Sequence, residues 1–172
     1  NQKHTAALYN HNTSEDDLTI NKIYMELYAD TATYKIGRFS QDWALGAIYD
    51  SGSDAWERHF FARDGVSAEF KIGNFAINPY WAKPSSGTKL NSRDDISEWG
   101  FSILYDNPEK DMAFGLLYAS KKHKPNGSYT SEESGSSLNI GSAKVKLTDL
   151  YFRKSFGSFE FKAEIPILGG DM

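Results

Sequence analysis

The sequence predicts an all-β fold, an antiparallel up-and-down transmembrane β-barrel whose strands follow one another along the chain. Apolar and polar residues alternate with a period of two in several stretches, which is typical of strands. The connections between these stretches alternate strictly between short and long. No apolar run approaches the roughly 18 residues that a transmembrane helix needs, whereas a barrel strand crosses with about 9–11 residues.

The first hairpin is expected to comprise strands at residues 21–30 and 33–41. Met25 and Leu27 lie on one face of the first strand, and Glu26 lies on the other. This alternation predicts a strand with one apolar and one polar side.

The second hairpin is expected at residues 64–72 and 75–83, joined by a turn at Gly73 and Asn74. Apolar residues from Val66 onward alternate with polar ones, and the pattern resumes at Phe75. Pro79 weakens the second strand because proline cannot donate a ladder hydrogen bond.

Two further hairpins complete a set of about eight strands. One is expected at residues 97–106 and 111–121, and the other at residues 143–155 and 158–168. The alternation in 143–155 changes phase near Thr148, which we interpret as a β-bulge.

The connections fall into two classes. Those at residues 30–33, 73–74, 107–110 and 155–158 are tight turns, whereas those at 41–64, 84–96 and 122–141 are long and mostly polar. Outer-membrane barrels place short turns on the periplasmic side and long loops on the external side. The alternation therefore favours a membrane barrel over a soluble sandwich.

The composition excludes several classes of function. The chain has 19 Lys and Arg against 23 Asp and Glu, so it lacks the positive excess of a nucleic-acid-binding protein. The absence of cysteine excludes disulfides and thiolate metal sites. The four histidines fall in expected loops and no Gly-x-Ser-x-Gly motif frames a nucleophile, so we predict no enzyme, no metal site and no cofactor.

One stretch carries a family resemblance. Residues 34–39 read Tyr-Lys-Ile-Gly-Arg-Phe and residues 42–46 read Asp-Trp-Ala-Leu-Gly. This stretch and the strand–turn–strand–loop unit resemble the bacterial outer-membrane porins. The resemblance implies a channel for passive diffusion of small hydrophilic solutes in the outer membrane of a Gram-negative bacterium. It also implies contact with outer-membrane lipids and assembly into a homotrimer.

Residues 1–172 are expected to form a single barrel domain or barrel segment. Residues 1–20 would be a loop, residues 21–168 four hairpins, and residues 169–172 the start of another loop. With periplasmic tight turns, both ends of the chain lie on the external side, whereas porins resemble one another in having periplasmic termini. We therefore expect an internal segment of a larger barrel, cut in two external loops. The alternatives are that the periplasmic and external sides are interchanged, or that the fold is soluble.

The polar face of the strands would line the pore with charges of both signs, which filter solutes by size and charge. The expected pore-lining residues are Glu26, Lys35, Arg38, Glu69, Lys71, Glu98, Lys144, Lys146, Glu160, Lys162 and Glu164.

The loop at residues 41–64 is too apolar for a simple solvated loop. By resemblance to porins it would fold into the channel and narrow it, with arginines facing acidic residues. The expected constriction residues are Asp54, Glu57, Arg58, Arg63 and Asp64. A loop packed over the barrel mouth, or a subunit contact, stays an equal alternative.

Aromatic residues make up 15% of the chain, and several lie near the expected strand ends. In a membrane barrel such rings form girdles at the headgroups. The expected girdle residues are Tyr34, Trp81, Trp99, Tyr105, Phe156 and Phe159.

Two alternatives remain open. In the first, the apolar face is the core of a soluble antiparallel β-sandwich or barrel that binds a ligand such as a carbohydrate through its aromatic residues. In the second, a small eight-stranded membrane barrel has a lumen filled by side chains and serves a structural role without conducting. In the first alternative the apolar face is buried in the protein core, whereas in the channel it faces lipid, so its location distinguishes the two.

Overall fold

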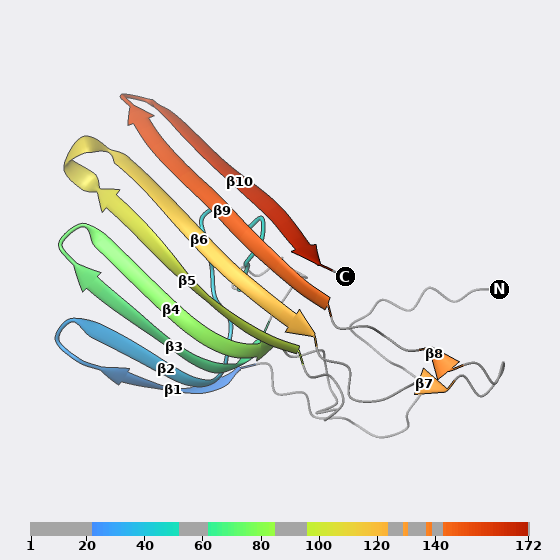
Figure 1. Ribbon diagram of the computed structural model, residues 1–172. Helices are drawn as coiled ribbons and strands as arrows, with labels where there is room; N and C mark the ends of the chain where they lie inside the picture. Colours follow the sequence, from blue (N-terminus) through green and yellow to red (C-terminus); the bar gives the residue numbers. More distant parts are fainter. Residues whose placement is uncertain are drawn as a thin grey trace, which may run out of the picture.

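The computed structural model describes residues 22–51, 62–84, 96–123, 129–130, 137–138 and 143–171. Eight of its strands form one sheet (Figure 1). They are β1 (Ile23–Tyr28), β2 (Ala32–Phe39), β3 (Arg63–Ile72), β4 (Phe75–Pro84), β5 (Ile96–Asn107), β6 (Met112–His123), β9 (Ala143–Phe156) and β10 (Phe159–Asp171). Two short strands, β7 (Tyr129–Thr130) and β8 (Ser137–Leu138), pair with each other inside the connection between β6 and β9.

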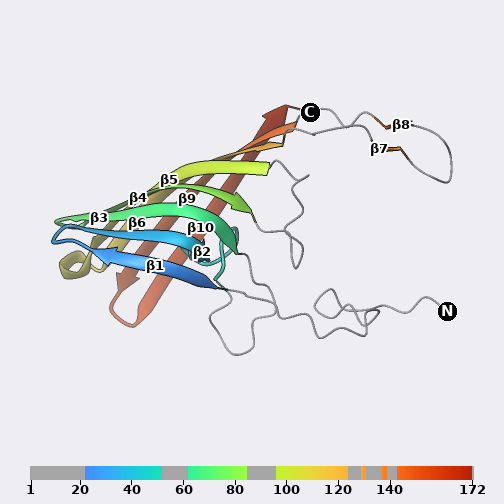
Figure 2. The same cartoon turned by 90° about the horizontal axis from the view of Figure 1, so that it is seen from below.

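The sheet has the order β1-β2-β3-β4-β5-β6-β9-β10, and every neighbouring pair is antiparallel. This confirms the prediction of an all-β, antiparallel, up-and-down arrangement of eight strands. Viewed from below, the sheet is curved (Figure 2). Its edges, β1 and β10, are not paired with each other, so the eight described strands form an open sheet.

Four tight turns lie together at one end of the sheet (Figure 1). Gly73 and Gly157 adopt φ values of 56° and 59° in the β3–β4 and β9–β10 turns, a conformation that glycine reaches without steric cost. The β5–β6 turn is a short 3₁₀ helix, η1 (Pro108–Lys110), in which the Asn107 side chain accepts a hydrogen bond from the Lys110 amide. We call this end of the sheet the turn end and the opposite end the loop end.

The ladder divides the side chains between two faces, because successive residues of a strand point to opposite sides. One face, here called the outer face, carries large apolar side chains with substantial exposure. Its exposed members include Met25, Leu27, Val66, Phe114, Leu150, Phe161 and Ile165. Aromatic rings also pair across strands on this face, with centroids 4.8 Å apart for Tyr105 and Phe114 and 5.5 Å apart for Trp99 and Tyr118.

The other face, here called the inner face, carries most of the charged strand residues together with small side chains. Ala82, Ala113 and Ala119 are buried there, and Ser102 lies between them on β5. The small side chains leave room for a chain segment to pack on the sheet.

Three charged residues predicted for the polar face lie on the outer face instead: Arg38, Lys144 and Lys146. The ladder of β9 with β6 and β10 runs without interruption, so the predicted bulge near Thr148 is absent and both lysines share the face of Leu150. Arg38 immediately precedes Phe39, which faces inward, and therefore points outward. The prediction that these three residues share the polar face is wrong.

Candidate functional site

The candidate site is built where residues 41–51, here called the inner segment, pack on the inner face. Trp43 and Tyr49 of the segment form a buried cluster with Tyr80, Leu117, Ala119 and Leu147 of the sheet. The sheet therefore holds the segment partly by apolar packing.

Local hydrogen bonds fold the inner segment back on itself. The Trp43 amide donates to the Tyr49 carbonyl at 3.0 Å, and the Gly46 amide donates to the Trp43 carbonyl at 2.9 Å. Gly46 takes a φ of 84°, in the region that favours glycine. The Asp42 carboxylate accepts a hydrogen bond from the Ser51 amide at 2.6 Å, which closes the far end of the segment.

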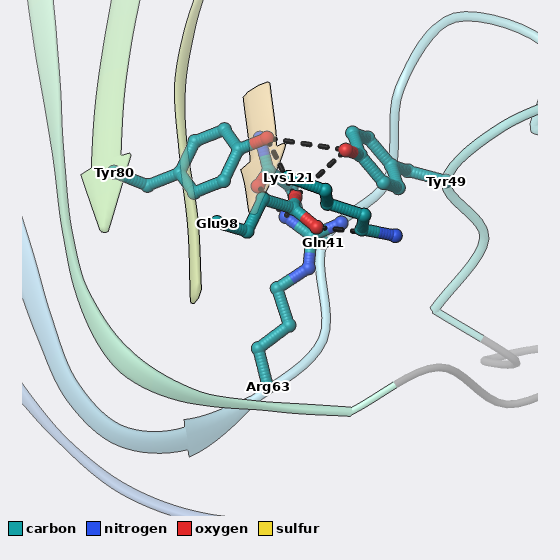
Figure 3. A network of polar contacts seen from close by, with 6 residues as sticks. All are labelled: Gln41, Tyr49, Arg63, Tyr80, Glu98 and Lys121. Carbon is teal, nitrogen blue, oxygen red and sulfur yellow. Dashed lines mark hydrogen bonds and ion pairs between the residues drawn. The ribbon is translucent and has the colours of Figure 1, made fainter. Parts of the chain in front are cut away.

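A polar network joins the inner segment to the sheet around Glu98 of β5 (Figure 3). Its Oε1 atom accepts hydrogen bonds from the hydroxyl of Tyr49 at 2.7 Å and from that of Tyr80 at 2.8 Å. Tyr49 belongs to the segment and Tyr80 to β4. The Oε1 atom of Glu98 thus accepts one hydrogen bond from the inner segment and one from the sheet.

Two cations neutralise the Glu98 carboxylate. Arg63 Nη1 lies 3.5 Å from Oε1, and Lys121 Nζ lies 3.2 Å from Oε2. Arg63 Nη1 also donates to the Gln41 side-chain oxygen at 3.0 Å. The side chains of Arg63 and Glu98 are completely buried. A buried charge is tolerated when it is paired and hydrogen-bonded, as this one is.

The Arg63 guanidinium also stacks on the tyrosines of the network. Its central carbon lies 3.8 Å from the Tyr49 ring centroid and 4.9 Å from that of Tyr80, so both rings contribute cation–π attraction. Burial, followed by the nearby Glu98 carboxylate, raises the pKa of the Tyr49 hydroxyl above its usual value. This hydroxyl therefore stays protonated and remains a hydrogen-bond donor at neutral pH.

A second polar contact fixes the middle of the inner segment to β10. The Glu164 Oε2 atom accepts hydrogen bonds from the amide of Leu45 at 2.7 Å and from that of Ala47 at 3.4 Å. Asp149 of β9 lies beside Glu164 and Trp43 and is completely buried. The segment is thus tied to β5 through Tyr49 and to β10 through its backbone.

A cavity of about 390 Å³ lies between the start of the inner segment and the sheet. Charges of both signs line it, and the Arg153 guanidinium donates to the Asp106 carboxylate at 2.8 Å. Other polar lining residues include Asp42, Glu69, Lys71, Asn78 and Ser102. A neighbouring cavity of about 260 Å³ is lined by Thr33, Lys35 and Ser67 among others. Both cavities offer polar surface beside the segment.

Eight of the predicted pore-lining residues lie on the inner face. They are Glu26, Lys35, Glu69, Lys71, Glu98, Glu160, Lys162 and Glu164. The strand lysines among them are paired locally, with 3.1 Å between Lys35 and Glu26, 3.0 Å between Lys71 and Glu69, and 2.7 Å between Lys162 and Glu160.

The predicted constriction residues are separated. Asp54, Glu57 and Arg58 lie outside the described residues. Arg63 and Asp64 belong to β3 and not to a loop. Arg63 points inward to Glu98, whereas Asp64 points outward and accepts two hydrogen bonds from Arg38, each at 2.8 Å. Asp64 therefore does not face Arg63, and its position relative to Arg58 lies outside the described residues.

All six predicted girdle residues lie on the outer face. Trp81 and Trp99 are register partners toward the loop end, and both are about half exposed. The others, Tyr34, Tyr105, Phe156 and Phe159, lie toward the turn end. The outer face thus carries aromatic rings at two levels along the strands.

Sequence reasoning missed the residues that hold the inner segment: Trp43, Tyr49, Tyr80, Lys121 and Asp149. A signal for the docking surface exists in the sequence. The inward positions of β5 and β6 include Gly100, Ser102, Gly115 and Ala119, which are small, although their neighbours on the outer face are large. Such a run of small residues on an otherwise charged face marks the place where another segment packs.

The described residues contain no helix that is long and apolar enough to span a membrane. Within the same ranges, no group of three or more His, Cys, Asp or Glu side chains is placed to hold a metal ion. Comparisons of the chain with protein-family models, curated proteins and solved structures found no match.

Proposed function

We propose that this chain forms part of the wall of a porin-like channel in the outer membrane of a Gram-negative bacterium. The channel allows passive diffusion of small hydrophilic solutes. One observation carries the proposal: an up-and-down sheet presents exposed apolar side chains on one face, and charged side chains with a docked inner segment on the other.

The outer face supports contact with lipid. Leu150 and Phe114 lie on interior strands of the sheet and are 44% and 45% exposed, so neither sheet neighbours nor the described connections cover them. A soluble sandwich buries such a face in its core. Hydrocarbon would cover it in a membrane, and the aromatic rings at two levels would meet the two headgroup regions.

The unpaired edge strands β1 and β10 support a barrel wall with more strands than the eight described. In a bilayer the backbone donors and acceptors of β1 and β10 need partners, because hydrocarbon offers none. We propose that additional strands of the same protein pair with these edges and close a larger barrel. Assembly into a homotrimer, as the family resemblance implies, belongs to this proposal.

The inner segment gives the channel its narrow part. In the proposed orientation, Trp43 and Tyr49 fix the segment against the wall, and the polar cavities beside it contain water. Solutes passing there meet Lys35, Glu69 and Lys71. Charges of both signs on facing surfaces favour small polar solutes and disfavour apolar ones.

The proposal is tested on the full-length protein from outer-membrane fractions. Unboiled and boiled samples are compared on an SDS gel, and the purified protein is then added to a planar lipid bilayer. A closed membrane barrel shifts its mobility on boiling, and a channel gives stepwise conductance. A shift without conductance would favour the non-conducting barrel. A protein that is recovered in the soluble fraction and shows no shift would contradict the membrane proposal.

A further inference from the structure

Three lysines converge on the outer face near the loop end. Lys122 of β6 and Lys144 of β9 are direct register partners, and Lys146 lies on the same face of β9, opposite Ser120. All three are exposed. Directly opposed residues in an antiparallel pair have Cβ atoms about 4.5–5.5 Å apart, so these ammonium groups share one small area.

This group of lysines differs from the strand lysines of the inner face. Lys35, Lys71 and Lys162 each form an ion pair with a glutamate. Among the residues whose side chains the structure describes, which do not include Asp171, no ion pair is found for Lys122, Lys144 or Lys146. The register places the backbone of Asp171 opposite that of Lys144, so this part of the ladder brings three lysines together with one aspartate. Like charges directly opposite each other destabilise a sheet, and an anion bound between them would remove that cost.

The surroundings indicate what kind of anion fits. Ser120 lies between Trp99 and Lys146 in the register, and the rings of Trp99 and Tyr118 are 5.5 Å apart. From there toward the turn end the outer face continues through apolar residues such as Leu116 and Leu150, which are register partners. An anionic group bound to the lysines would therefore lie next to the aromatic rings, and a row of apolar side chains would extend from those rings toward the turn end.

We propose that Lys122, Lys144 and Lys146 form a binding site for the phosphate headgroup of an anionic lipid. The acyl chains of that lipid lie along the outer face past Tyr118 toward Leu116 and Leu150. This inference rests on the proposed membrane location and adds a lipid class to it. Lysines that lie beside a bilayer surface attract anionic headgroups electrostatically.

The test measures lipid preference by fluorescence. The full-length protein is reconstituted in vesicles of phosphatidylcholine mixed with brominated phosphatidic acid, or of phosphatidic acid mixed with brominated phosphatidylcholine. Bromine quenches nearby tryptophan, and Trp99 lies next to the lysines, so the two series give the relative binding constant of the two lipids. We expect a preference for phosphatidic acid that falls roughly tenfold or more in the variant Lys122→Gln/Lys144→Gln.

Two controls separate the site from general charge. Lys110→Gln/Lys154→Gln removes two charges at the turn end, where the Lys154 ammonium donates to the Lys110 carbonyl, and should keep the preference. Lys122→Arg/Lys144→Arg keeps the positive charge and should retain most of the preference for phosphatidic acid. The heat-dependent gel shift of each variant reports folding. If a variant fails to fold, protection of Lys122 and Lys144 from amine acylation is measured in the unmodified protein, with and without phosphatidic acid.

The outcomes distinguish the two proposals. Equal quenching by both brominated lipids in the unmodified protein, or an equal loss in the turn-end control, would overturn the lipid site. Complete displacement of brominated phosphatidic acid by inorganic phosphate would also overturn it, because the lysines would then bind the free anion. The absence of quenching by either lipid would instead contradict the membrane location itself.

Discussion

Trp43 packs directly over Gly115, and a Cβ atom on that glycine would lie 2.7 Å from Cη2 of the indole ring. The substitution Gly115→Ala should therefore displace Trp43 and loosen the inner segment. We expect an unfolding free energy lower by about 1–3 kcal/mol, the usual cost of overpacking, and noisier channel current. Thermal loss of the heat-resistant gel band and single-channel recording measure the two effects.

Gly169→Ala is the matched control for this change. A Cβ atom there meets nothing within 4 Å. Equal effects of the two substitutions would show that Trp43 does not depend on the space above Gly115.

Glu98→Gln should strongly destabilise the sheet. It leaves the buried Arg63 and the Lys121 ammonium without their counter-charge. Removing one partner of a buried pair costs about 3–5 kcal/mol. The midpoint of chemical unfolding, followed by tryptophan fluorescence, measures this cost. Glu69→Gln breaks an exposed pair with Lys71 and should change stability by less than about 1 kcal/mol.

Tyr49→Phe should release the inner segment more than Tyr80→Phe does. Both hydroxyls donate to the same oxygen of Glu98 and lie 3.2 Å from each other, so either substitution removes its bond to Glu98 and the bond between the two tyrosines, at a cost of about 1–3 kcal/mol for each lost bond. Only Tyr49 lies on the segment. We expect larger conductance and faster proteolytic cleavage within residues 41–51 for Tyr49→Phe, and smaller changes for Tyr80→Phe, which leaves the Tyr49–Glu98 bond in place. Identical behaviour of the two variants would mean that the hydroxyl of Tyr49 does not hold the segment.

Leu150→Arg tests the environment of the outer face. Leu150 is 44% exposed, so a water-exposed sheet would tolerate the arginine with little change. A lipid-facing position near the bilayer midplane would cost about 2–4 kcal/mol. The yield of heat-resistant protein after refolding into vesicles measures the difference. Ser67→Arg, beside an inner-face cavity, should refold normally and alter ion selectivity instead.

The sequence predicted the strands well because each interior strand carries a period-two pattern that survives in the structure. The paired run from Ile96 to Asn107 on β5 is an example. The assignment of faces failed where two polar residues lie near each other but are separated by an odd number of positions. Arg38 and Lys35 differ by an odd number of positions, so one ladder cannot place both on one face. In β9 the apparent change of phase came from polar outward residues, Lys144 and Lys146, and not from a bulge.

The candidate site was predicted less well, for a physical reason. The inner segment has no regular hydrogen-bonding period, so only tertiary contacts determine its position. Tyr49 and Glu98 are 49 positions apart, and no local pattern links them. Glu98 was predicted to be on the polar face, but its burial depends on Tyr49, Tyr80, Arg63 and Lys121 arriving from four other parts of the chain.

The contact between the Leu45 amide and the Glu164 carboxylate spans 119 positions of sequence. Closing so long a loop is entropically costly, and the contact forms only when β10 has joined β9. The first long connection of the chain is therefore completed by its last described strand. The apolar cluster and the Tyr49–Glu98 bond need no residue of β10, so the inner segment can settle on the inner face before β10 arrives, and its middle is fixed only by the last strand.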